Sequence, residues 1–140
     1  MNPLSVDIKD LLESSNLGIF GTNLFIGKEP TSPSNCVTLY DTGGSEQNAR
    51  LALDEGTIQV RSRNTDYRLG YDILDSIKMN IEGRNSIEIN ETIYVGFWTI
   101  SNIAYITQDD IGRSIFTINF RVMREPKVSD RGHRQPVGGI

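Results

Sequence analysis

Between Phe116 and Val122, apolar and polar side chains alternate without a break. This period of two is the pattern of a β-strand that buries one face and leaves the other toward solvent or a partner. It predicts a strand over Ser114–Val122. Thr57–Arg63 alternates in the same way, with Ile58 and Val60 on its apolar side. The chain therefore needs a sheet with one covered face.

Three further segments favour strands. Residues 18–26 form a β-prone stretch that begins with glycine, and Cys36–Tyr40 is a second short strand after a proline-containing loop. Ser86–Ile89 and Thr92–Thr99 are typical of a hairpin around Asn90-Glu91. We expect its second arm to continue to residue 106, with a bend or bulge near residues 101 and 102.

Two segments have helical periodicity. Ser5–Ser15 carries apolar residues at helical spacing, and we expect Ser5 to cap this helix. Asp66–Glu82 has a broader apolar stripe, three candidate caps in Asn64, Thr65 and Asp66, and a stop signal in Gly83. The second helix is long enough to cross from one strand to a distant one.

The order of these segments predicts an α+β fold, with one mostly antiparallel sheet and both helices packed on one face. Residues 1–126 form the single domain in this interpretation. Residues 127–140 are rich in glycine and charge, poor in apolar residues, and expected to be a flexible tail. Asp41–Glu55 lacks apolar periodicity and is predicted to be a long, flexible or functional loop.

Composition excludes several classes of function. The net charge of −4 argues against a protein that wraps DNA over its whole surface. One cysteine, Cys36, and one histidine, His133, are too few for a structural zinc site. The N-terminal sequence predicts no signal peptide, and residues 93–106 are too short and polar to span a membrane.

No arrangement of residues predicts catalysis, a metal or a cofactor. The Gly18–Gly21 segment lacks the lysine and the spacing of a phosphate-binding loop. Asp109 and Asp110 could be imagined as a metal or acid–base pair, but a solvated turn is the ordinary interpretation. Cys36 is interpreted as a small buried hydrophobe rather than a reactive thiol.

Aromatic residues cluster around Trp98, as they do on sheets that bind single-stranded nucleic acid. Residues 92–107 contain no lysine or arginine, however, so packing in the core or at an interface is the better account. A strand that ends up at the sheet edge must be covered, charged or paired with another chain. Residues proposed for contact with other copies or partners are Asp41, Gly43, Gly44, Glu46, Arg50, Asp54, Glu55, Arg61, Arg63, Asp109, Asp110 and Arg121.

Several stretches together carry a family resemblance. They are Gly18–Gly27, Glu29–Pro33, Val37–Gly44, Leu53–Glu55 with the strand Ile58–Arg61, and Phe116–Arg121. Over Val6–Pro126 the chain resembles a family of phage minor capsid or tail-completion proteins. In the order of its elements it is similar to the tail terminators of lambda-like siphophages.

This resemblance implies a tail-terminator-like α+β fold without catalytic residues. It implies a homo-oligomer, typically a ring of six subunits, that caps the tail tube protein and meets the head–tail connector or adaptor. The location implied is the tail or neck of a virion assembled in the host cytoplasm. An acidic lumen would repel DNA and let it pass without specific binding, which a positive lumen in the assembled ring would contradict.

Two other functions stay open at this point. A head-side completion or connector protein of the same virion would bind the portal or adaptor instead of the tail tube. A small binding module or enzyme of the host is disfavoured by the shortage of histidine and cysteine. A strong rise in melting temperature with metals or nucleotides would favour this last interpretation.

Overall fold

The segment with the strictest alternation lies inside the sheet, as its pattern predicts. The computed structural model describes residues 1–44 and 53–125. Within these residues the elements are α1 (Leu4–Ser14), β1 (Leu24–Ile26), β2 (Cys36–Gly43), β3 (Asp54–Asn64), α2 (Tyr67–Ile81), β4 (Asn85–Ile89), β5 (Thr92–Gln108) and β6 (Ser114–Glu125).

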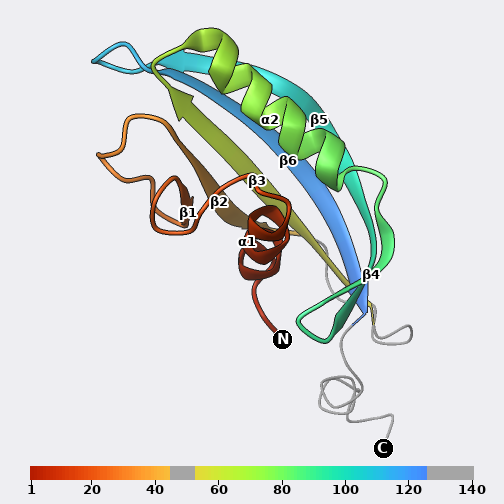
Figure 1. Cartoon of the computed structure of the whole chain (residues 1–140). Helices are drawn as coiled ribbons and strands as arrows, with labels where there is room; N and C mark the ends of the chain where they lie inside the picture. The colour runs from red at the N-terminus through yellow and green to blue at the C-terminus, as the bar shows by residue number, and fades with distance from the viewer. Residues whose placement is uncertain (45–52, 126–140) are drawn as a thin grey trace, which may run out of the picture.

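The described strands form one curled sheet in the order β1-β2-β3-β6-β5-β4 (Figure 1). Only the β1–β2 pair is parallel, and the other pairs are antiparallel. The α+β fold with a mostly antiparallel sheet is thus confirmed. β6 lies between β3 and β5 and pairs with both along its length, which explains why its apolar side chains are buried.

Helix α2 is capped by Asp66, one of the three candidates, and has the predicted stop. The Asp66 carboxylate accepts a hydrogen bond from the Leu69 N–H at 3.1 Å, and Gly83 follows the helix with a φ of +83°. The helix carries the chain from β3 across β6 and β5 to the start of β4 (Figure 1). The β4–β5 hairpin turns at Asn90 and Glu91, both with positive φ, as its sequence predicts.

Helix α1 begins differently from the prediction. Its first residue is Leu4, and Pro3 precedes it without a side-chain cap. Ser5 lies inside the first turn and is buried, so the expectation that it caps the helix is wrong. Its N–H and hydroxyl instead donate to the carboxylate of Asp41 at the end of β2, at 3.0 and 2.5 Å.

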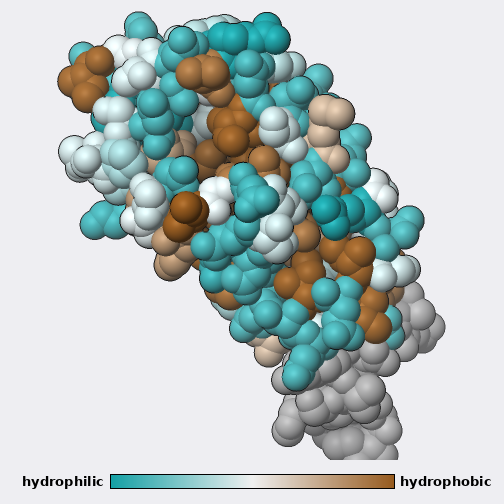
Figure 2. Space-filling model, viewed as in Figure 1, coloured by the Kyte–Doolittle hydropathy of each residue, from teal (hydrophilic) through white to brown (hydrophobic). Residues whose placement is uncertain are grey.

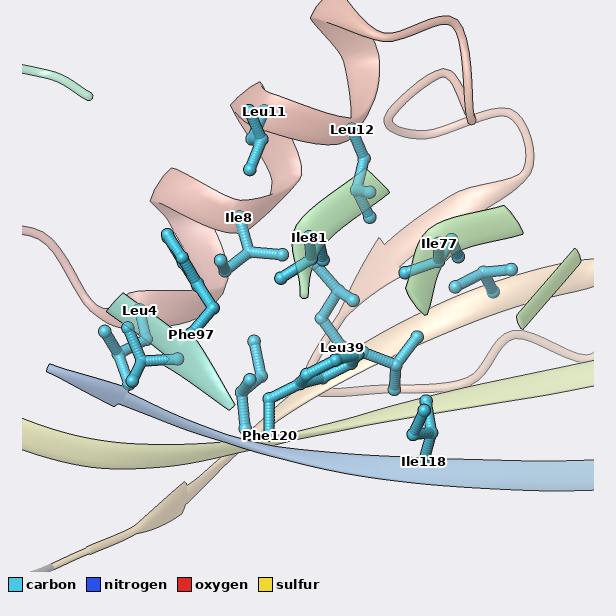
Figure 3. Packing of buried hydrophobic residues seen from close by; sticks show 14 of the residues in the cluster. Leu4, Ile8, Leu11, Leu12, Leu39, Ile77, Ile81, Phe97, Ile118 and Phe120 are labelled. Atoms are coloured by element: carbon cyan, nitrogen blue, oxygen red, sulfur yellow. The ribbon is translucent and has the colours of Figure 1, made fainter. Parts of the chain in front are cut away.

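Both helices bury their apolar stripes against the same face of the sheet. In Figure 3, leucine and isoleucine side chains of α1 point toward Ile81 of α2, Phe97 of β5 and Phe120 of β6. Each Å² of apolar surface removed from water stabilises the fold by roughly 25 cal/mol. One cluster of buried side chains joins both helices to the sheet. It contains Leu4, Ile8, Leu11, Leu12, Leu24, Val37, Leu39, Ile58, Val60, Leu74, Ile77, Ile81, Tyr94, Phe97, Phe116, Ile118, Phe120 and Val122.

Strand β5 is longer than its neighbour β4. The two pair only between Thr92 and Gly96, so from Trp98 onward the outer edge of β5 has no strand beside it in the described chain. Register shifts against β6 fall between Thr99 and Ser101 and between Ser101 and Ala104, which confirms the predicted bend.

Two predicted boundaries were wrong. The stretch 18–26 is a turn followed by a short strand, because only Leu24–Ile26 pairs with β2. Asp41–Gly43 and Asp54–Glu55 belong to strands β2 and β3 rather than to a loop. Residues 45–52 and 126–140, which include the predicted tail, lie outside the described residues.

Candidate assembly surfaces

Five of the predicted contact residues gather where β2 ends and β3 begins. Asp41, Gly43, Gly44, Asp54 and Glu55 line a pocket of about 440 Å³. Pro3, Leu4, Gly56, Thr57 and Arg124 complete its wall. We call this region the loop base. Glu46 and Arg50, predicted with this group, lie outside the described residues.

Two carboxylates of the loop base have structural partners. Asp41 accepts both hydrogen bonds from Ser5, and Asp54 accepts one from Arg124 Nε at 2.8 Å. These contacts fix the start of α1 and the start of β3 to the sheet. The two side chains therefore position the loop base, whichever partner it meets.

Glycine is required at Gly44 by the close approach of two backbones. A Cβ atom on Gly44 would lie 2.5 Å from the Cα of Gly56, and the φ of Gly44 is +137°. No other residue fits this conformation without displacing the neighbouring strand. The path of the chain out of β2 is thus determined locally.

A buried polar cluster lies behind the loop base. Asp7 and Tyr94 are fully buried, and the Tyr94 hydroxyl donates to the Asp7 carboxylate. Arg124 Nη1 donates to the Tyr94 oxygen at 3.2 Å and to the Asn2 carbonyl at 2.6 Å. Burial, together with the bond to Asp7, raises the pKa of Tyr94 above its usual range. Each group has a partner, which indicates a clamp between α1, β5 and β6 rather than a reactive site.

Arg121 lies on the sheet face that is turned away from the helices. Its guanidinium is 5.2 Å from the ring centroid of Trp98 and 3.5 Å from a carboxylate oxygen of Glu55. About half of the Arg121 side chain is exposed. This arrangement leaves an accessible, partly neutralised cation beside an exposed aromatic ring.

Arg63 belongs to the polar side of the alternating stretch Thr57–Arg63, a pattern that predicts exposure to solvent or a partner. It is only 4% exposed, so that expectation is wrong at this residue. Its guanidinium donates to the carbonyls of Pro30 and Pro33 at 2.5 and 2.8 Å and lies 3.5 Å from Glu29. The β1–β2 loop thus folds under the sheet and covers Arg63. Arg61, also predicted as a contact residue, is half-buried and pairs with the same glutamate at 3.2 Å.

The β5–β6 turn places Asp109 and Asp110 at the other end of the sheet. Asp109 accepts from the Arg113 N–H at 2.8 Å and from Arg113 Nε at 2.6 Å. Desolvation alone would raise the pKa of Asp109, but the bonds from Arg113 outweigh it and hold that pKa below its usual value. Asp110 is exposed and forms no ion pair within residues 1–44 and 53–125. The two residues occupy a turn, as the ordinary interpretation predicts.

A second hollow of about 390 Å³ lies between α2 and the segment that joins α1 to β2. Figure 2 shows apolar surface beneath the N-terminal half of α2, where this hollow opens. Leu17, Val37, Leu69 and Ile73 supply its apolar lining. Cys36 also lines it, is buried as predicted, and has a pKa that burial raises. No ionisable groups converge here in the way a catalytic site requires.

The sequence interpretation missed the exposed apolar residues at the sheet edges. Trp98, Ile100, Tyr105 and Ile106 of β5 are exposed, and so are Ile19 and Phe20 beside β1. The available signal was the lack of lysine and arginine around them, which favoured packing without saying where. Among the described residues no group of acidic, histidine or cysteine side chains could hold a metal ion. Neither described helix is long and apolar enough to cross a membrane.

Comparisons with known proteins agree with this architecture. The sequence matches the family described as "Bacteriophage tail terminator protein" over residues 11–125. No protein with a curated description matches the chain. A chain of the solved structure titled "Virion of native gene transfer agent (GTA) particle" has a TM-score of 0.63 and 13% identity, covering 88% of this chain and 95% of that chain. At this identity the structural likeness shows a shared fold.

Proposed function

Because the chain belongs to the bacteriophage tail terminator family, we propose that it forms a ring that caps the tail tube and joins it to the head connector. Its place is in the virion, as a structural protein of the tail. The proposed ring contains six copies, binds the tail tube protein on one side and the connector or adaptor on the other, and performs no catalysis.

The observation that carries this proposal is the position of two surfaces at opposite ends of the strands. β3 starts at Asp54, opposite Arg124 of β6, and ends at Asn64, opposite Ser114. The loop base lies at the first end, and the Asp109–Asp110 turn lies at the second. A ring between two different partners needs two different axial surfaces, and these two surfaces meet that need.

The predicted contact residues divide between these surfaces in our proposal. The loop base, with Glu46 and Arg50 of the segment beyond it, meets one axial partner, and Asp109–Asp110 meets the other. Arg61 and Arg121 border the sheet face between them. Arg63 is excluded from the contact residues, because its buried guanidinium donates to carbonyls of the β1–β2 loop.

Charge supports passage of DNA without specific binding. The chain has a formal net charge of −4, and Arg61 and Arg121 are each paired with a glutamate. Phosphate binding needs clustered unpaired cations. A ring of such subunits repels the duplex and lets it slide.

Polymerisation of the cognate tail tube protein tests the proposal. The wild-type chain, added below the tube subunit concentration, should shorten the tubes and leave a ring at one end in electron micrographs. Glu55→Lys and Asp110→Lys each reverse a charge at one axial surface, and one of them should abolish capping while the other should block joining to purified heads. The control is Met79→Lys, because Met79 lies on α2 and is 78% exposed; this variant should cap tubes as the wild type does.

Unchanged tube lengths with the wild-type chain would overturn the proposal. Binding to the portal or adaptor with no effect on tubes would instead assign the chain to head-side completion.

A further inference from the structure

The outer edge of β5 is an open sheet edge with no charged residue of its own, although Lys78 and Glu82 of α2 bond to Asn102 and Thr99 of this strand. The strand has 17 residues, and none of them is Asp, Glu, Lys or Arg. From Trp98 to Gln108 no strand pairs with this edge in the described chain. Soluble proteins protect such edges with charges, prolines or covering segments, because unpaired backbone groups recruit other chains.

Exposed apolar side chains follow the same part of β5. Ile100 is 56% exposed and Ile106 is 52% exposed. Tyr105 is also exposed, and its ring lies 5.3 Å from that of Tyr67 on α2, so the aromatic surface continues onto the helix. Contiguous apolar surface at a sheet edge marks a protein interface.

A matching surface lies at the opposite edge of the sheet, beside β1 (Figure 1). Residues 14–27 also contain no charged side chain, and Ile19 in this segment is 60% exposed. The turn is held in place, because the Phe20 N–H donates to Glu13 at 3.0 Å and Lys9 lies 5.2 Å from the Phe20 ring centroid.

The two edges lie at the same level along the strands. Leu24 of β1, Val37, Ser62, Phe116 and Tyr105 of β5 form one continuous row of paired residues. The pairings also make β1 antiparallel to β5. A second copy placed beside the first in the plane of the sheet therefore brings its β1 edge to the open part of β5, in the direction that β4 already uses.

We propose that the open β5 edge of one copy receives residues 19–26 of a second copy, and that this head-to-tail contact repeats around the ring. The inference rests on the proposed function for the repetition, but the contact itself is a property of two copies. A contact between two different surfaces forms a ring when the rotation from copy to copy closes, whereas a contact of β5 with β5 would close at two copies.

Side chains rather than a long ladder make this contact. The Leu24 N–H and carbonyl are already bonded within the chain, to Ile19 and Gly21 at 3.2 and 3.0 Å. Phe20 is bridged to Leu24 and so lies level with Tyr105, and Ile19 and Phe20 therefore meet Tyr105 and Ile106. The C-terminal segment is a poorer occupant, because Pro126 and Pro136 lack the N–H that an added strand donates.

Cysteine cross-linking tests the contact directly. One chain carries Ile106→Cys and the other Ile19→Cys, both in a Cys36→Ser background, and each is checked for an unchanged thermal transition. Under mild oxidation at high protein concentration, the mixture should form disulfide-linked pairs, and neither chain should do so alone. Ile106→Cys mixed with Met79→Cys is the matched control and should stay uncross-linked.

Three results would overturn the inference. They are the absence of cross-linked pairs in the mixture, self-linking of the Ile106→Cys chain, and loss of the cross-link on deletion of residues 127–140. If tubes are not capped but the cross-link forms, the proposed function fails while the contact stands.

Discussion

Ser5 in the first turn of α1 donates two hydrogen bonds to Asp41, which lies 36 residues away in β2. Its N–H is 3.0 Å from Oδ1, and its hydroxyl is 2.5 Å from Oδ2. The carboxylate thus satisfies a free N–H at the positive end of the helix from a distant strand, which joins helix capping to tertiary structure.

Asp41→Ala should therefore lower the free energy of unfolding by about 1–2 kcal/mol, the usual cost of losing a helix cap. Urea denaturation measures this change. Asp110→Ala removes an exposed aspartate from a turn and should change stability by less than about 0.5 kcal/mol. Equal effects of the two substitutions would show that the Asp41 contact does not stabilise the helix.

Arg63 holds the β1–β2 loop under the sheet. Arg63→Met removes one of the cations beside Glu29 and leaves the Pro30 and Pro33 carbonyls without the guanidinium that donates to them. We expect the free energy of unfolding to fall by about 3–5 kcal/mol. Arg61→Met removes a half-buried partner of the same glutamate and should cost less. Thermal and urea unfolding of the two variants give the comparison, and a milder effect at Arg63 than at Arg61 would contradict the account.

The raised pKa of Tyr94 leads us to expect a lower free energy of unfolding at alkaline pH. Its pKa is raised in the folded protein by burial and by the bond to Asp7, so the folded state favours the protonated phenol. Its contribution is fully present below the unfolded pKa of about 10 and is lost as pH rises above that value. Burial also raises the pKa of Tyr40, so both residues contribute to the decline.

Tyr94→Phe isolates the part that belongs to Tyr94. The variant should lose about 1–3 kcal/mol at neutral pH, because Asp7 and Arg124 lose a buried partner. Its stability should then fall less steeply above pH ~10 than that of the wild type. Free energies of unfolding from urea denaturation, plotted against pH for the variant and the wild type, give the comparison. Parallel plots would show that ionisation of the Tyr94 phenol is not coupled to unfolding.

Phe120 lies at the centre of the core and is fully buried. Phe120→Ala should cost about 3–5 kcal/mol, because the deletion leaves a cavity between the sheet and α1. A loss below about 1 kcal/mol in urea denaturation would mean that the surrounding side chains collapse into the space. Met123→Ala, on the partly exposed opposite face of β6, is the matched control and should cost much less.

Deletion of residues 127–140 should leave the domain folded. The segment has few apolar residues, and the described core is built without it. Differential scanning calorimetry should show one cooperative transition near that of the full chain. Loss of this transition would place part of the core in the C-terminal segment.

Local patterns were sufficient for much of the fold. The alternation in β6, the stripe and cap of α2 and the Asn90-Glu91 turn each depend on residues close in sequence. Such features depend on local sequence more than on which distant segments they meet. They predicted the antiparallel sheet, the bend in β5 and the helices on one face.

Features made by distant segments were beyond the sequence. The partner of Ser5 is a strand residue, and Arg63 is buried only because the β1–β2 loop folds beneath it. The open edge of β5 depends on where β4 stops, which no pattern within β5 reveals. The candidate contact residues were chosen from loop composition and strand patterns; five of them line the loop base, and the exposed apolar residues at the sheet edges were missed.

Cryo-electron microscopy of tails assembled with the cognate tube protein tests the central claim most directly. The account predicts a single ring of this chain at the head-proximal end of every finished tube, with the β5 edge of each copy against Ile19 and Phe20 of the next. A tube end without this chain, or a lone copy at that end, would contradict it.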